Sequence, residues 1–83
     1  MFIQKRFNIQ PYLLEEHDGR WYVGIPPDDI IESQLRRWCD EVIGEYEVEW
    51  GVDYDEFYSP LTSGTLFWFT SEESLFLFRA RCL

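Results

Sequence analysis

Carboxylates form the most distinctive chemical pattern in this chain. They alternate with apolar residues from Glu45 to Asp55, where the sequence reads E-Y-E-V-E-W-G-V-D-Y-D. Because successive side chains of a β-strand point to opposite faces, this alternation predicts a strand with one apolar face, buried in the core, and one acidic face. We name the acidic face the carboxylate ladder, and its members are Glu45, Glu47, Glu49, Asp53 and Asp55.

Acids in this arrangement suggest two kinds of chemistry. Asp53, Asp55 and Glu56 carry the oxygen ligands that a divalent cation prefers, but two of them share a strand face and no glycine-containing twelve-residue loop surrounds them, so a solvated face is favoured over a metal site. The other possibility is attraction of a basic protein surface. Same-face residues of a strand lie roughly 6.7 Å apart, about twice the phosphate spacing along one DNA strand, so the ladder is a sparse imitation of a nucleic-acid backbone.

The ladder can also be interpreted as a solvated strand face without a binding function. An exposed strand face is polar in any case, and charged side chains keep a sheet edge from pairing with other chains. This explains the polarity of the pattern but not its single sign.

Catalytic groups are sparse. His17 is the only histidine, and its place beside Asp18 and Gly19 predicts a solvated turn residue rather than a catalytic base. The five glycines are dispersed, so no phosphate-binding loop is predicted. Cys39 and Cys82 lack metal-ligand spacing and are expected to be reduced thiols. We therefore predict a protein without enzymatic activity, cofactor or metal.

The net charge restricts the partners. Of the 83 residues, the segment 28–58 contains eleven acids and only two bases, Arg36 and Arg37, which accounts for the whole formal charge of −9. Such a charge opposes direct binding to nucleic acid or to an anionic membrane and favours a basic protein partner. No apolar run approaches the roughly 20 residues of a membrane span, and no signal peptide is evident, so a cytoplasmic protein is expected.

The element pattern predicts a single α+β domain over residues 1–83. We expect an antiparallel sheet of about five strands, covered on one face by helix, in the order strand, strand, strand, helix, strand, strand and a final element. His17 to Arg20 reads as a two-residue hairpin turn, which pairs Leu14 with Val23. The predicted strands are 2–9, 12–16 with its hairpin partner, 45–55 and 65–70, and the predicted helix is 28–43, with Gly44 as its C-terminal cap.

The final element, residues 72–82, permits two interpretations. Thr70 and Glu73 fit a capping box that would begin a helix with Leu75, Phe78 and Cys82 facing inward, and a hairpin strand is the less favoured alternative. The predicted core comprises Ile3, Phe7, Leu14, Val23, Ile31, Leu35, Trp38, Val42, Val48, Trp50, Phe67 and Phe69.

The C-terminal string F-W-F-T-S-E-E-S-L-F-L-F-R-A-R-C resembles an ending of short uncharacterised proteins of tailed phages. The chain departs from those endings at Ser74 and Cys82, where they carry alanine and tryptophan. The resemblance covers about a fifth of the chain and implies a phage source without implying an activity. The matching positions are Phe67, Phe69, Glu72, Glu73, Leu75, Phe78 and Arg79.

These patterns predict a small acidic interaction protein that binds a basic surface of a host protein, plausibly one that handles nucleic acid. It would act as an inhibitor or adaptor in the host cytoplasm, and nucleic-acid mimicry against a defence protein is one form of this function. The alternative is an assembly protein that self-associates through Trp21, Tyr22, Phe57 and Tyr58, so both monomer and homodimer stay open. The predicted partner-binding residues are Glu45, Glu47, Glu49, Asp53, Asp55 and Glu56, with Phe57 and Tyr58 as aromatic anchors.

Overall fold

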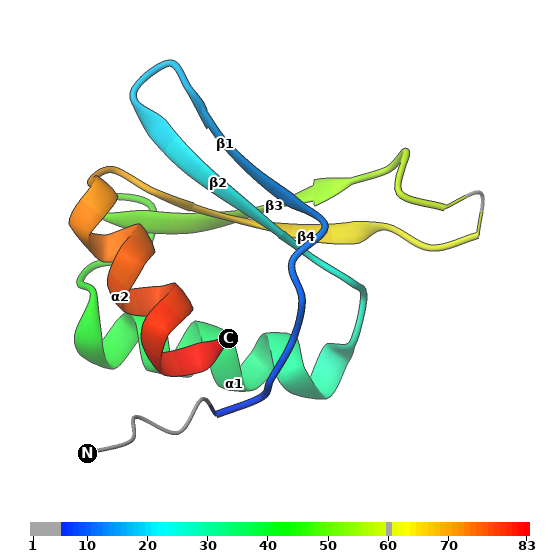
Figure 1. Ribbon diagram of the computed structural model, residues 1–83, viewed down its shortest axis with the longest axis horizontal. Helices are drawn as coiled ribbons and strands as arrows, with labels where there is room; N and C mark the ends of the chain where they lie inside the picture. The colour runs from blue at the N-terminus through cyan, green and yellow to red at the C-terminus, as the bar shows by residue number, and fades with distance from the viewer. Residues whose placement is uncertain (1–5, 60) are drawn as a thin grey trace.

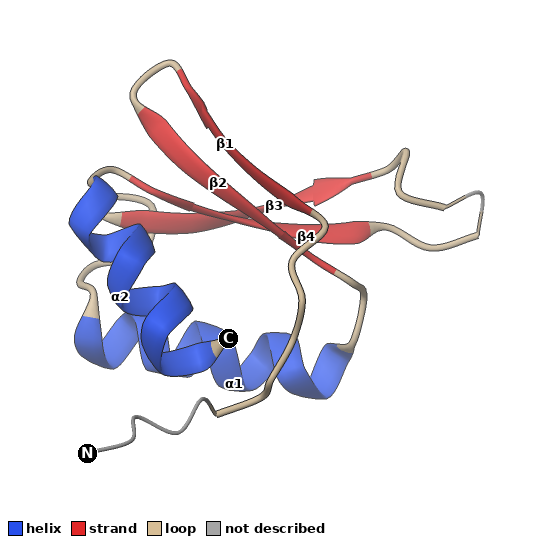
Figure 2. Ribbon diagram, in the orientation of Figure 1, coloured by secondary structure: helices blue, strands red, loops and turns tan. Residues whose placement is uncertain are grey.

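A computed structural model describes residues 6–59 and 61–83 and has a four-stranded antiparallel sheet with two helices (Figure 1). Both helices lie on one side of the sheet, and no helix of the described residues covers the other side, which we name the helix-free face (Figure 2). The predicted α+β fold is confirmed, and the described residues form four of the about five predicted strands. The strand order is β1-β2-β4-β3, and the elements are β1 (Leu13–His17), β2 (Arg20–Ile25), α1 (Asp29–Val42), β3 (Trp50–Asp55), β4 (Gly64–Phe69) and α2 (Glu72–Cys82).

The predicted first strand, 2–9, is absent where it can be checked. Residues 1–5, including Ile3 of the predicted core, lie outside the described residues, and residues 6–9 form no strand. The N–H groups of Arg6 and Phe7 instead donate to the carbonyls of Arg81 and Cys82, at 3.2 and 3.1 Å. These carbonyls lack partners within α2, so the segment satisfies the end of the helix rather than extending the sheet. Asn8, with φ of 54°, interrupts any extended run.

The hairpin is confirmed. Asp18 and Gly19 have φ of 51° and 79°, as a two-residue type I′ turn requires. His17 pairs with Arg20, and Leu14 with Val23, as the alternation predicts.

The two helices are also confirmed, with small changes at their caps. The Asp28 carboxylate accepts from the N–H groups of Ile30 and Ile31, and this cap places the start of α1 close to its predicted position. Gly44 follows the last turn with φ of 149°. Ser71, rather than Thr70, caps α2 by accepting from the N–H of Ser74 at 3.2 Å.

The core lies between the helices and the covered sheet face. Phe78 of α2 is at its centre, with ring centroids 5.9, 5.2 and 5.0 Å from those of Trp38, Phe67 and Phe69. Most of the predicted core is correct. Val23, Leu35, Trp50, Phe67 and Phe69 are buried, and Phe7, Ile31 and Trp38 pack against them.

Three predicted core residues are exposed. Leu14 is 44% exposed because it lies on the edge strand β1, while α2 packs over β2 and β4. Val42 is 48% exposed in the last turn of α1, and Ile43 packs against the core next to it. Val48 is 57% exposed because its segment is a turn rather than a strand.

Candidate binding surface

The predicted carboxylate ladder does not form, because β3 begins at Trp50 and the five residues before it fold back. The N–H groups of Val48 and Glu49 both donate to the Glu45 carbonyl, at 3.1 and 2.9 Å. Glu47 adopts a left-handed conformation with φ of 65°. Of the five ladder residues, only Asp53 and Asp55 therefore share a strand face.

Trp50 explains why the chain turns here. Its side chain is 2% exposed, and its indole N–H donates to the Gly44 carbonyl at 2.9 Å, so the start of β3 is tied to the end of α1. The turn at residues 45–49 lets the chain connect the end of α1 to the start of β3 over the short distance that this hydrogen bond sets. Glu49 stabilises it, since its carboxylate accepts from the N–H of Glu45 at 2.7 Å. Glu49 thus has a structural role in place of the predicted binding role.

Acids and apolar groups alternate across the helix-free face. Strand pairing places Leu13, Gly24, Leu66 and Asp53 in one row across the four strands, and Glu15, Tyr22, Trp68 and Gly51 in the next. In both rows the two central strands carry apolar or glycine positions, whereas a carboxylate stands on an outer strand. The face therefore has an apolar floor with acids at opposite edges.

Trp68 lies flat on this floor. It is only 5% exposed although no helix of the described residues covers it. An ideal Cβ at residue 51 would fall 2.2 Å from the Trp68 ring, so only glycine permits the ring to lie against β3. The guanidinium of Arg20 covers the ring from above, at 3.9 Å from its centroid, in a cation–π contact.

Tyr12 closes the opposite end of the floor. Its ring lies over Gly24 and Gly64, where added Cβ atoms would fall 2.7 and 2.9 Å from the ring. Its hydroxyl donates to Asp55 at 3.2 Å, and its ring centroid is 4.6 Å from that of Tyr58. Burial, followed by the charge of Asp55 and this hydrogen bond, raises the pKa of Tyr12 to about 12.

The Tyr12 contact predicts a loss of stability in alkali. The unfolded phenol ionises near its ordinary pKa of 10.0, below the folded value of about 12, so the contribution of the hydroxyl is complete below pH 10 and is lost as the pH rises to 12. We expect Tyr12→Phe to be less stable than wild type by about 0.5–1.5 kcal/mol at pH 8. Denaturant unfolding from pH 8 to pH 12 should show this difference shrinking above pH 10, and a constant difference would contradict the contact.

Between Tyr12 and Trp68 lies a hollow of about 360 Å³. Its floor contains Leu13, Tyr22 and Leu66, and Glu15 and Asp53 stand at its sides. Within residues 6–59 and 61–83, neither of these two carboxylates forms an ion pair. His17 and Tyr54 complete the lining. A smaller adjoining hollow of about 240 Å³ includes Arg20, Glu47, Val52, Asp53 and Trp68.

The predicted anchors lie beside this face. Residues 56–59 and 61–63 belong to the connection from β3 to β4, which extends beyond the sheet (Figure 1). Phe57 is 95% exposed and Leu61 is 93% exposed, so both are available to a partner. Tyr58 is 38% exposed and packs on Tyr12. Glu56 is exposed in the same connection.

The structure therefore brings together only part of the predicted site. Asp53, Asp55, Phe57 and Tyr58 lie on or beside the helix-free face, whereas Glu45 and Glu49 belong to the turn after α1. Sequence reasoning missed the other residues of the face. The available signal was that β2 and β4 are apolar on both faces while the chain has too few helices to cover both. The missed residues are Tyr12, Leu13, Glu15, Leu66 and Trp68, whereas Tyr22 was predicted only as part of a self-association surface.

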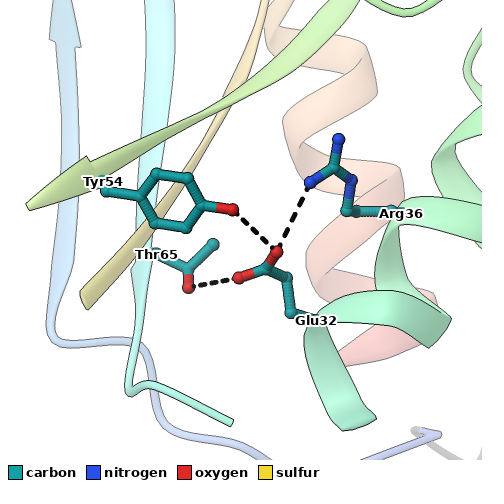
Figure 3. A network of polar contacts seen from close by, with 4 residues as sticks. All are labelled: Glu32, Arg36, Tyr54 and Thr65. Carbon is teal, nitrogen blue, oxygen red and sulfur yellow. Dashed lines mark hydrogen bonds and ion pairs between the residues drawn. The ribbon is translucent and has the colours of Figure 1, made fainter. Parts of the chain in front are cut away.

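A second polar cluster lies on the other side of the sheet, around Glu32 of α1 (Figure 3). Its carboxylate accepts from the hydroxyls of Thr65 and Tyr54, at 2.9 and 3.0 Å, and lies 3.4 Å from the Arg36 guanidinium. Burial and the bond to Glu32 raise the pKa of Tyr54. Because these contacts join α1 to β3 and β4, we interpret the cluster as a structural tie.

Removing this tie is expected to destabilise the fold. Glu32→Ala leaves the buried Thr65 hydroxyl without its partner, which costs about 1–3 kcal/mol in the free energy of unfolding. Glu32→Gln keeps a carbonyl oxygen that can accept from the buried Thr65 hydroxyl, although its amide group replaces the oxygen that accepts from Tyr54, and it should lose less. Equal losses for the two variants, measured by denaturant unfolding, would show that the hydrogen bonds contribute nothing beyond the charge.

In the part of the chain that the structure describes, no group of three or more His, Cys, Asp and Glu side chains could hold a metal ion. His17 lies at the hairpin tip, 3.2 Å from the Asp18 carboxylate. None of the helices described is both long and apolar enough to cross a membrane.

Comparison with known proteins gives no relative: no protein-family model, curated protein or solved structure matches this chain.

Proposed function

We propose that this protein is a non-enzymatic binding protein whose helix-free face contacts a basic surface of another protein. The observation that carries the proposal is the combination on one face of an apolar floor, unpaired carboxylates at its edges and no covering element among the described residues. An exposed apolar patch bordered by polar groups is typical of a protein interface.

The rigidity of the floor supports this function. Tyr12, which is 36% exposed, is held against Gly24 and Gly64, so it loses little conformational freedom when a partner covers it. Aromatic residues fixed in this way are typical centres of binding energy. Phe57, which is almost fully exposed, is the candidate for a further anchor that enters a pocket of the partner.

The acidic charge supports a basic partner in particular. A net charge of −9 speeds encounter with a positively charged surface, and the attraction weakens as salt screens exposed charges beyond roughly 8–10 Å. The regular spacing that suggested nucleic-acid mimicry is not present, because the ladder is broken by the turn before Trp50. We therefore propose the broader class, a basic protein. If the chain is phage-encoded, the basic partner is a host protein, and this chain acts on it as an inhibitor or adaptor.

Affinity capture tests the proposal with two variants of equal charge. The face variant carries Glu15→Gln and Asp53→Asn, and the control variant carries Glu41→Gln and Asp40→Asn, which are exposed on α1. At low salt, wild type and the control variant should capture the same partner from a host lysate, and the face variant should capture at least several-fold less. Equal capture by both variants would show that binding uses another surface.

Self-association is the second candidate function, and the exposure of Phe57 and Leu61 favours it. Sedimentation velocity of wild type and of Phe57→Ser separates the two. A concentration-dependent dimer that the substitution disperses would support assembly, whereas a monomer at all concentrations would leave the binding function as the better account.

A further inference from the structure

We infer that the hollow on the helix-free face takes an extended peptide segment of the partner with the pattern basic-x-apolar-x-basic, lying across the strands. This inference rests on the proposed function and adds the chemistry and orientation of what is bound. The observation behind it is the position of Glu15 on β1 and Asp53 on β3, the two outer strands, at opposite sides of one apolar hollow.

The spacing of the acids fixes the spacing of the basic residues. Three inter-strand steps separate β1 from β3, which corresponds to roughly 14 Å at about 4.8 Å for each step. Glu15 and Asp53 are also offset by two residues along the strands, which adds roughly 7 Å in that direction and gives roughly 16 Å between them. In an extended segment, residues i and i+4 lie on the same face and roughly 13–14 Å apart, so two basic side chains with three residues between them come close to this spacing. The long stems of Lys and Arg can span the remaining distance.

The floor fixes the chemistry of the central residue. Leu13, Tyr22 and Leu66 lie between the two acids and offer apolar surface. The residue at i+2 of the segment points to the same side as i and i+4 and would enter the hollow, so an apolar side chain there is favoured.

Arg20 limits where the segment lies. Its guanidinium covers Trp68 and would repel a second cation placed there. The segment is therefore expected to run diagonally across the hollow, from Glu15 past Tyr22 and Leu66 to Asp53, rather than over Trp68.

Two peptides of identical composition provide the test. The first is acetyl-Lys-Gly-Leu-Gly-Lys-amide, and the second, acetyl-Gly-Lys-Leu-Lys-Gly-amide, has the same charge with its lysines two residues apart. We expect the first to shift the NMR signals of Leu13, Tyr22 and Leu66 and to bind roughly fivefold more tightly, because its lysines match the separation of the two carboxylates more closely. Glu15→Gln with Asp53→Asn should abolish this preference, and Glu41→Gln with Asp40→Asn should retain it.

The outcomes separate this inference from the proposed function. Equal affinity for the two peptides, or signal changes confined to residues outside the hollow, would overturn the inference. The capture experiment tests the face itself, so the face can be a binding surface even if these peptides do not distinguish it. Equal capture by the face and control variants, together with a retained peptide preference, would instead refute the face as the surface for the captured partner and leave the hollow as a peptide site.

Discussion

Phe78→Ala is expected to lower the free energy of unfolding by about 3–5 kcal/mol, which is the usual cost of removing a buried aromatic ring. Phe78 is fully buried and contacts rings from α1 and from β4, so its removal leaves a cavity where three elements meet. A chain of this length is typically stable by about 4–12 kcal/mol, so the variant should lose a large part of its stability and unfold at a much lower denaturant concentration.

Phe76 provides a matched control for this prediction. It lies on the same helix and is 56% exposed, so Phe76→Ala should cost much less in the free energy of unfolding. Chemical denaturation of both variants measures the difference. Similar losses would mean that the C-terminal helix does not pack through the face described.

Gly51→Ala is expected to be the most damaging single-methyl change on the helix-free face. The added Cβ would fall 2.2 Å from the Trp68 ring, and the central position of β4 leaves the ring little room to withdraw. Overpacking of this kind costs about 1–3 kcal/mol. Displacement of Trp68 would also break its contact with Arg20 and should change the tryptophan fluorescence.

A double-mutant cycle isolates the cause. In the background of Trp68→Ala the ring is absent, so Gly51→Ala should then cost far less. If its cost in unfolding free energy is the same in both backgrounds, the clash with Trp68 is not the reason that Gly51→Ala is destabilising.

The sequence predicts most of the covered side of this fold. Periodicity over α1 identifies its buried face around Leu35, and the capping pattern before Glu72 identifies α2. The turn at Asp18 and Gly19 sets the register of the hairpin, because a one-residue shift would exchange its two faces. These are local signals, and they succeed because local preference and tertiary packing agree here.

The candidate site depends on tertiary contacts and was predicted only in part. Alternation from Glu45 to Asp55 favours a strand, but burial of the Trp50 indole beside Gly44 turns the first half of this run away from the sheet. The position of Tyr12 over Gly24 and Gly64 depends on the pairing of β2 with β4, which are far apart in sequence. No local pattern could indicate which acids would border the same hollow.

NMR mapping with the captured partner tests the central claim most directly. Isotope-labelled protein is titrated with the unlabelled partner, and the perturbed amide signals are placed on the fold. We predict changes concentrated on the helix-free face, at Leu13, Tyr22, Leu66 and Asp53, that diminish at high salt. Changes concentrated on the exposed surfaces of α1 and α2, with this face unaffected, would contradict the account.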